Sequence, residues 1–110
     1  MPRVTTTIQN HIAHVELTRS DKMNAVDPAM LAAIIEAGEA LRGNTDVRAV
    51  VLSGQGNAFC AGLDVASFAA LAGGDPHEIM MPRTRGPSND YQHVSMIWHQ
   101  LEMPVIAALQ

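Results

Sequence analysis

The stretch of residues 47–64 constrains the fold more than any other part of the chain. It begins with an apolar run over residues 47–52, of the kind that forms a buried strand, and this run ends at Gly54. A second turn of small residues follows and leads directly into Asp64, a residue type that often caps a helix N-terminus. Because its side chains are small, the peptide N–H groups of this turn are open to approach. Such groups can bind an anion or stabilise negative charge that develops during a reaction.

The residues before this stretch predict a hairpin followed by a helix. Residues 4–8 and 11–17 are rich in β-branched residues, and two polar residues separate them. Ile12 is out of phase with the alternation, so we expect one strand to twist or bulge. Asp27 then caps a helix that has proline at its first position. The apolar stripe of this helix consists of Leu31, Ile34, Ile35, Gly38 and Leu41, and Gly43-Asn44 ends it with a left-handed cap.

The residues after the central stretch predict a further alternation of helix and strand. We expect a short helix from Asp64 that stops at Gly73, and an irregular, proline-containing segment over residues 75–89. Asp90 is expected to cap a final helix, and Pro104 precedes the last strand. Strands that alternate with helices favour an α/β fold on a parallel or mixed sheet. The residues of the final helix expected to face inward are Val94, Ile97, Trp98 and Leu101.

Size, charge and cysteine content exclude several classes of protein. The chain has 110 residues, which allows one domain at most, and its net charge of −4 with seven unclustered basic residues argues against a nucleic-acid surface. No apolar run approaches the roughly 20 residues that span a bilayer, and the first ten residues lack the apolar core of a signal peptide. The single cysteine, Cys60, excludes an internal disulfide framework. We therefore expect a cytoplasmic protein with neither a membrane nor a nucleic-acid partner.

The final residues indicate that the chain is part of something larger. Residues 103–110 resemble a buried strand, yet no further segment follows to cover it. We expect residues 1–110 to be the N-terminal portion of a single domain. An unpaired apolar strand also predicts that these residues aggregate or associate when they are produced alone.

Most chemistry-bearing side chains are better explained by structural roles. The Gly54-Gln-Gly56 turn is not a dinucleotide loop, because Phe59 stands where the third glycine would be. Cys60 has no base beside it and is expected to be a buried, inert thiol. Asp64 is better explained as a helix cap than as an acid or base, and Lys22 as a loop lysine. The histidine pairs are poorly placed to share a metal ion, so no metal is expected; the pairs are His11 with His14 and His93 with His99.

Four motifs occur in order and at suitable spacing along the chain. They are residues 19–25 (RSDKMNA), 47–54 (VRAVVLSG), 58–64 (AFCAGLD) and 104–108 (PVIAA). Together they resemble the first part of the enoyl-CoA hydratase/isomerase family, and the likeness covers essentially all 110 residues. It implies a crotonase-like (ClpP/crotonase) α/β fold, a truncated spiral of ββα units. It also implies an acyl-CoA thioester as substrate, with no separate cofactor because CoA is part of that substrate, and a homo-oligomer that is a trimer or hexamer at full length.

The resemblance also implies roles for individual residues. The backbone N–H of Leu63 is similar to the first oxyanion-hole donor of the family, which stabilises the enolate oxygen of the thioester. The segment to Asp64 is similar to the beginning of the CoA cleft, with the adenine contacts on the backbone around Ala61 and with Gly62 letting the backbone approach the ligand. Lys22 and Met23 match the loop that lines the CoA phosphates and the pantetheine arm, with Ala25 nearby.

The resemblance implies an enoyl-CoA hydratase and leaves two alternatives open. One is dienoyl-CoA or enoyl-CoA isomerisation, because the long segment 73–89 and the helix before Pro104 somewhat resemble the dienoyl isomerase branch. The other is a non-catalytic acyl-CoA-binding or assembly subunit. The second oxyanion donor and the catalytic carboxylates of the family follow the 104–108 motif and fall beyond Gln110. We therefore expect residues 1–110 alone to be inactive.

Overall fold

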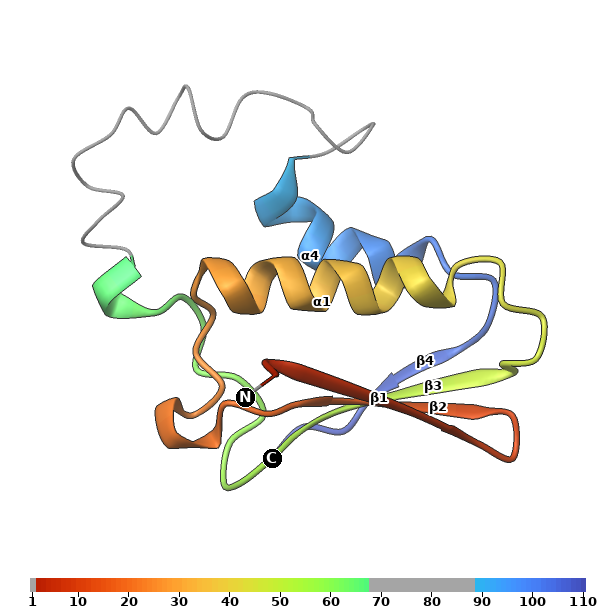
Figure 1. Ribbon diagram of the computed structural model, residues 1–110, viewed down its shortest axis with the longest axis horizontal. Helices are drawn as coiled ribbons and strands as arrows, with labels where there is room; N and C mark the ends of the chain where they lie inside the picture. The colour runs from red at the N-terminus through yellow and green to blue at the C-terminus, as the bar shows by residue number, and fades with distance from the viewer. Residues whose placement is uncertain (1, 68–88) are drawn as a thin grey trace.

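The computed structural model describes residues 2–67 and 89–110, and in these ranges one mixed sheet carries two α-helices on the same face (Figure 1). The strand order is β1-β2-β3-β4; β1 and β2 are antiparallel, and β3 and β4 continue the sheet in parallel. The strands are β1 (Val4–Gln9), β2 (Ile12–Leu17), β3 (Ala49–Gly54) and β4 (Val105–Ala107). The helices are η1 (Ser20–Lys22, a 3₁₀ turn), α1 (Pro28–Leu41) and α4 (Asp90–His99).

The predicted hairpin is confirmed, but its strands pair without a bulge. The register runs unbroken from Val4 opposite Leu17 to Gln9 opposite Ile12. The core-facing positions of β2 are taken by Ala13, Val15 and Leu17, which are at most 2% exposed. Ile12 therefore lies half-buried on the opposite face of a regular strand, and its phase needs no bulge.

Helix α1 begins as predicted, and a left-handed glycine follows its C-cap. The Asp27 carboxylate accepts a hydrogen bond of 2.8 Å from the Met30 N–H, and proline occupies the first helical position. The C-cap itself is Arg42, which is extended, and the left-handed residue is the next one, Gly43, with φ +76°. The buried face of α1 differs from the prediction at one position, because Met30 is buried and Leu31 is only half-buried. The other predicted stripe residues are buried: Ile34, Ile35, Gly38 and Leu41.

Helix α4 begins at a different cap from the predicted one. Asn89, not Asp90, is the N-cap: its side chain accepts a hydrogen bond of 2.9 Å from the Gln92 N–H. The Gln92 side chain in turn accepts from the Asn89 N–H, which completes a capping box. Asparagine and aspartate cap helices equally well. The N-cap is therefore decided by Gln92, whose side chain accepts from the Asn89 N–H. Of the four side chains expected to face inward, two are buried (Ile97 and Leu101) and two are half-buried (Val94 and Trp98).

The two helices approach each other closely where α1 has no side chain. A Cβ atom on Gly38 would lie only 2.5 Å from Cγ1 of Ile97, so glycine at this position permits the contact. His93 of α4 is also buried at this interface and faces α1. Its Nε2 atom lies 2.8 Å from Oε1 of Glu39. The helices thus form one layer over the sheet, and the core lies between this layer and β1–β4.

The last strand lies at the edge of the described sheet. β4 pairs only with β3 among these residues, and Ile106 remains 58% exposed. Such an edge is the physical basis of the association that the sequence predicts. Within residues 2–67 and 89–110, no helix is both long enough and apolar enough to cross a membrane.

Candidate functional site

The small-residue turn after β3 runs alongside the loop that precedes α1. The Ala61 N–H donates to the Met23 carbonyl at 3.0 Å, and the Val26 N–H donates to the Gly62 carbonyl at 2.7 Å. The Asp64 N–H then donates back to the Val26 carbonyl at 2.9 Å. These bonds create a single parallel bridge between Val26 and its partner, Leu63. Two segments predicted separately as ligand-binding loops are therefore brought side by side.

This bridge leaves the Leu63 peptide N–H unpaired. In a parallel bridge the residues on either side of the bridged one supply the hydrogen bonds, as Gly62 and Asp64 do here. The N–H of Leu63 itself points away from Val26 and has no hydrogen-bond partner among the described residues. Gly62 permits this course of the backbone, because its φ of +94° is strained for any residue with a side chain.

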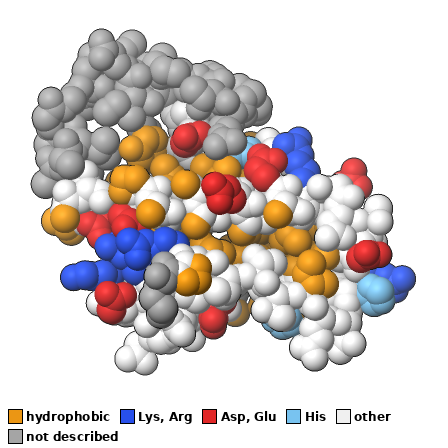
Figure 2. Space-filling model, in the orientation of Figure 1, with side chains coloured by type: hydrophobic (Ala, Val, Ile, Leu, Met, Phe, Trp, Pro, Cys, Tyr) orange, Lys and Arg blue, Asp and Glu red, His pale blue; other side chains and the backbone are white. Residues whose placement is uncertain are grey.

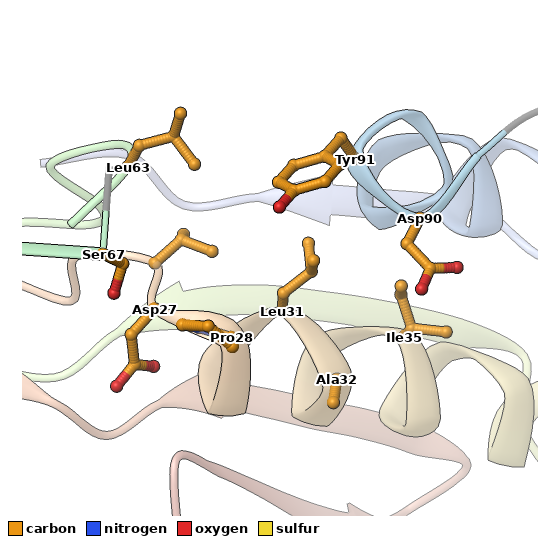
Figure 3. Close-up of a pocket in the computed structure, with 10 residues that line it drawn as sticks. Asp27, Pro28, Leu31, Ala32, Ile35, Leu63, Ser67, Asp90 and Tyr91 are labelled. Carbon is orange, nitrogen blue, oxygen red and sulfur yellow. The ribbon is translucent and has the colours of Figure 1, made fainter. Parts of the chain in front are cut away.

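A cavity of about 220 Å³ is lined in part by Leu63, the residue that follows the small-residue turn. In Figure 3, Leu31 points from α1 toward Tyr91 of α4, while Leu63 lies across from Tyr91. Most of the cavity wall is apolar, and Asp27, Ser67 and Asp90 contribute polar groups to it. The lining residues are Val26, Asp27, Pro28, Leu31, Ala32, Ile35, Leu63, Ser67, Asp90 and Tyr91.

The buried side chain of Asn24 clasps the turn to the loop. Its Oδ1 accepts from the Arg19 N–H at 2.8 Å, and its Nδ2 donates to the Gln55 carbonyl at 3.0 Å and to the Ala58 carbonyl at 2.8 Å. Asn24 is fully buried and has φ +56°, a conformation that asparagine tolerates better than most residues. The sequence analysis missed this role. The only local signal was an asparagine in a loop rich in polar residues.

A chain of ion pairs joins the loop, the start of α1 and the turn. Arg19 lies 2.8 Å from Oδ2 of Asp64 and 3.5 Å from Oδ2 of Asp27, which also contacts Arg3 at 2.8 Å. The side chains of Arg19, Asp27 and Asp64 are only 12–13% exposed, so water screens these contacts weakly. Figure 2 shows basic and acidic side chains packed against one another at one end of the molecule. The Arg19 pairing was also missed from the sequence.

The ion pairs and backbone hydrogen bonds favour the charged form of both aspartates. The Ser67 N–H, at 3.1 Å, and the Arg19 guanidinium lower the pKa of Asp64. For Asp27, burial raises the pKa, but the Met30 N–H and the two arginines outweigh it and lower the pKa overall. The bond from Ser67 is the one expected of an N-cap, so the predicted capping role of Asp64 is confirmed.

The remaining predicted site residues lie along the rim of the same two segments. Lys22 is exposed in η1 and forms no ion pair with a described residue. Met23 is 59% exposed and Ala25 is half-buried, whereas Ala61 and Gly62 are exposed beside them. An exposed cation, an exposed thioether and an exposed stretch of backbone therefore lie on the two segments that the bridge joins, and none of these residues lines the cavity.

Cys60 and the histidines do not form a reactive or metal-binding cluster in the part of the chain that the structure describes. Cys60 is half-buried, not buried as predicted, because the turn that carries it lies at the surface; its Sγ lies 3.5 Å from the Gly62 nitrogen. The Nδ1 atom of His11 lies 2.9 Å from the Asp46 carbonyl oxygen. Within the described ranges, no three His, Cys, Asp or Glu side chains are grouped to hold a metal ion.

Comparison with known proteins gives one consistent family. Residues 7–110 match the enoyl-CoA hydratase/isomerase family. The mitochondrial Delta(3,5)-Delta(2,4)-dienoyl-CoA isomerase of Mus musculus is 32% identical over 107 residues, which cover 94% of this chain and 33% of that protein. A "Probable enoyl-CoA hydratase" of Mycobacterium tuberculosis is 35% identical over 102 residues, covering 93% of this chain and 37% of that protein.

A solved structure agrees with the fold. The enoyl-CoA hydratase from Shewanella pealeana superposes with a TM-score of 0.84 at 24% identity, over 98% of this chain and 39% of that one. The chain spans about a third of the length of the curated relatives it matches. Its mixed sheet with covering helices is the corresponding part of a crotonase-like α/β fold. This chain belongs to the enoyl-CoA hydratase/isomerase family.

Proposed function

We propose that the protein acts on acyl-CoA thioesters and that its reaction is the hydration of a 2-enoyl-CoA. The observation that carries this proposal is the unpaired Leu63 N–H beside a cavity. When water adds to the β-carbon of an enoyl thioester, negative charge moves onto the thioester oxygen. A backbone donor that is already oriented toward that oxygen stabilises the transition state, and one such donor is worth about 3–4 kcal/mol.

The two sides of the site have different tasks in this proposal. The Leu63 N–H holds the thioester oxygen, and because the flanking peptides are bonded to Val26, little reorganisation is needed when charge develops. The exposed Lys22 is available to bind a CoA phosphate. Met23 and the Ala61-Gly62 backbone are exposed and can contact the pantetheine arm and the adenine of CoA. Asp64 and Asp27 are engaged with arginines and backbone donors, so neither is assigned acid–base work.

A second candidate reaction is the isomerisation of a dienoyl-CoA. It is favoured by the 32% identity to the mouse dienoyl-CoA isomerase. Shifting a double bond also passes through an enolate-like thioester, so the Leu63 N–H serves both reactions equally. The two reactions differ in the groups that deliver and remove protons. We further propose that residues 1–110 alone bind such thioesters without turning them over.

Two substitutions at one position test the proposal. Leu63→Pro deletes the N–H without breaking a hydrogen bond among the described residues, whereas Leu63→Ala keeps the N–H and shortens the side chain. The probe is acetoacetyl-CoA, whose enolate has its own near-ultraviolet absorbance, compared with CoA. We expect the unsubstituted chain to bind the enolate in preference to CoA, and Leu63→Pro to weaken that preference about 100-fold.

The controls separate binding from catalysis. Leu63→Ala should retain the enolate preference, and hydration of crotonyl-CoA by residues 1–110 should be undetectable. If Leu63→Pro binds the enolate as tightly as the unsubstituted chain does, the N–H is not the donor and the proposed function is wrong. Turnover by residues 1–110 would refute the proposed inactivity.

A further inference from the structure

The orientation of the Leu63 N–H depends on contacts that Leu63 does not itself make. On one side it follows Gly62, which has φ +94° and no side chain to anchor it. On the other side it precedes Asp64, whose carboxylate accepts from the Ser67 N–H at 3.1 Å. The cap bond shapes the turn that follows but does not attach it to the rest of the molecule. The peptide itself is held against the loop before α1 by the backbone hydrogen bonds to Val26, and a side-chain contact beside these bonds can brace them further.

Arg19 is the side chain that braces these backbone hydrogen bonds. Its Nη1 donates to Oδ2 of Asp64 at 2.8 Å and also to the Ala25 carbonyl at 3.0 Å. Asp64 follows Leu63 in the chain, and Ala25 precedes Val26, the bridge partner of Leu63. The guanidinium thus spans both segments beside the bridge. Its planar fork suits this task, because it bonds several acceptors without rearranging.

The surroundings make the contact effective. The side chains of Arg19 and Asp64 are 12% and 13% exposed, so their attraction is screened less than that of a surface pair. Arg19 is held in turn, because its backbone N–H donates to Asn24 and its Nη2 lies 3.5 Å from Oδ2 of Asp27. The group that fixes the peptide is therefore itself fixed. It lines neither the cavity nor the exposed rim.

We propose that Arg19 is a positioning residue, which aims the Leu63 N–H through Asp64 and so sets how strongly the site stabilises an enolate. The inference rests on the proposed function for its chemical consequence, but the aiming of the peptide is a property of the unliganded chain. Loss of the Arg19 guanidinium should leave the Asp64 cap and the backbone hydrogen bonds to Val26 in place, while allowing the Leu63 peptide larger movements about its mean orientation. A misaimed donor loses transition-state stabilisation more than it loses general affinity.

Four variants separate positioning from simple stability. Arg19→Gln removes the charge and the fork. Asp64→Asn keeps a good N-cap but loses the ionic partner. Arg3→Gln is the matched control, because Arg3 pairs with Asp27 at 2.8 Å and does not touch Asp64. Arg19→Lys retains the charge with a single ammonium group and should restore part of what Arg19→Gln loses.

The first readout is the ratio of affinities for acetoacetyl-CoA and CoA. We expect Arg19→Gln and Asp64→Asn each to lower the ratio about tenfold, with the affinity for CoA unchanged. The double variant should be no worse than Arg19→Gln alone, because the contact between Arg19 and Asp64 is already lost in that variant. Arg3→Gln should leave the ratio unchanged. Equal losses for both ligands, or a loss as large in Arg3→Gln, would overturn the inference.

The second readout needs no ligand and decides the inference if the proposed function fails. Nuclear magnetic resonance relaxation of the Leu63 amide in the unliganded chain should show greater mobility in Arg19→Gln, while the Val50 amide in β3 stays rigid. An unchanged Leu63 amide would overturn the positioning role whatever the ligand data show. If the unsubstituted chain does not prefer the enolate, the proposed function is lost, and the amide result alone then judges the role of Arg19.

Discussion

Replacing Asn24 tests whether the clasp between the loop and the turn holds the site together. Asn24→Gly removes three hydrogen bonds and leaves the Arg19 N–H and the carbonyls of Gln55 and Ala58 without their partner. At about 1 kcal/mol for each bond, the free energy of unfolding should fall by about 3 kcal/mol. Asn24→Ala should cost about 1 kcal/mol more, because φ is +56° at this position and alanine is strained there.

These losses are large on the scale of the whole chain. A protein of this size is stable by about 5–15 kcal/mol, so Asn24→Ala removes a substantial fraction of that free energy. With a denaturant dependence of about 2 kcal/mol per molar urea, Asn24→Gly should lower the unfolding midpoint by about 1.5 M. The assay is urea unfolding followed by circular dichroism and by Trp98 fluorescence, and coincident curves would justify the two-state treatment.

The control for this experiment lies in the same turn. Asn57 is exposed, so Asn57→Ala should change the free energy of unfolding by less than about 0.5 kcal/mol. The reasoning is refuted if Asn24→Gly is as stable as Asn57→Ala, because the buried hydrogen bonds would then contribute nothing. If Asn24→Ala and Asn24→Gly are equally stable, the claim that the positive φ at this position strains alanine is refuted.

Three further predictions follow from the helices and the charged network. Gly38→Ala should destabilise the chain by about 1–3 kcal/mol in urea, because the new methyl group would meet Ile97 at 2.5 Å; a stabilised variant would contradict the close contact. The lowered pKa values of Asp27 and Asp64 mean that their stabilisation is complete above about pH 3.9 and is lost as pH falls through the folded-state values. The urea midpoint should therefore drop on acidification below pH 4, and less steeply in Asp27→Asn; an equal slope would argue against the ion pairs. Gly62→Ala should strain the turn and lower the affinity for the enolate of acetoacetyl-CoA more than the affinity for CoA. If the variant binds both ligands as tightly as the unsubstituted chain does, the backbone accommodates alanine at this position.

Local sequence patterns were sufficient to predict the helices and strands that are specified by residues close together in the chain. The hairpin, the start of α1 at Asp27 and the strand that leads to Gly54 are each specified within a few residues. The four motifs were likewise sufficient for the family, because their order and spacing survive in the sequence. The capping of α4 was displaced by one residue, since Asn89 and Asp90 have equal capping ability and Gln92 decides between them.

The amino-acid sequence by itself determined the strand and helix pattern and placed a bare backbone turn next to Leu63. Only the tertiary structure decided that this N–H is unpaired, because that depends on a bridge to Val26 from a distant loop. The same holds for Arg19, whose partner Asp64 is 45 residues away, and for the Asn24 clasp, which spans more than 30 residues. Such contacts leave no periodic trace in the sequence, because each depends on which surfaces the completed fold brings together.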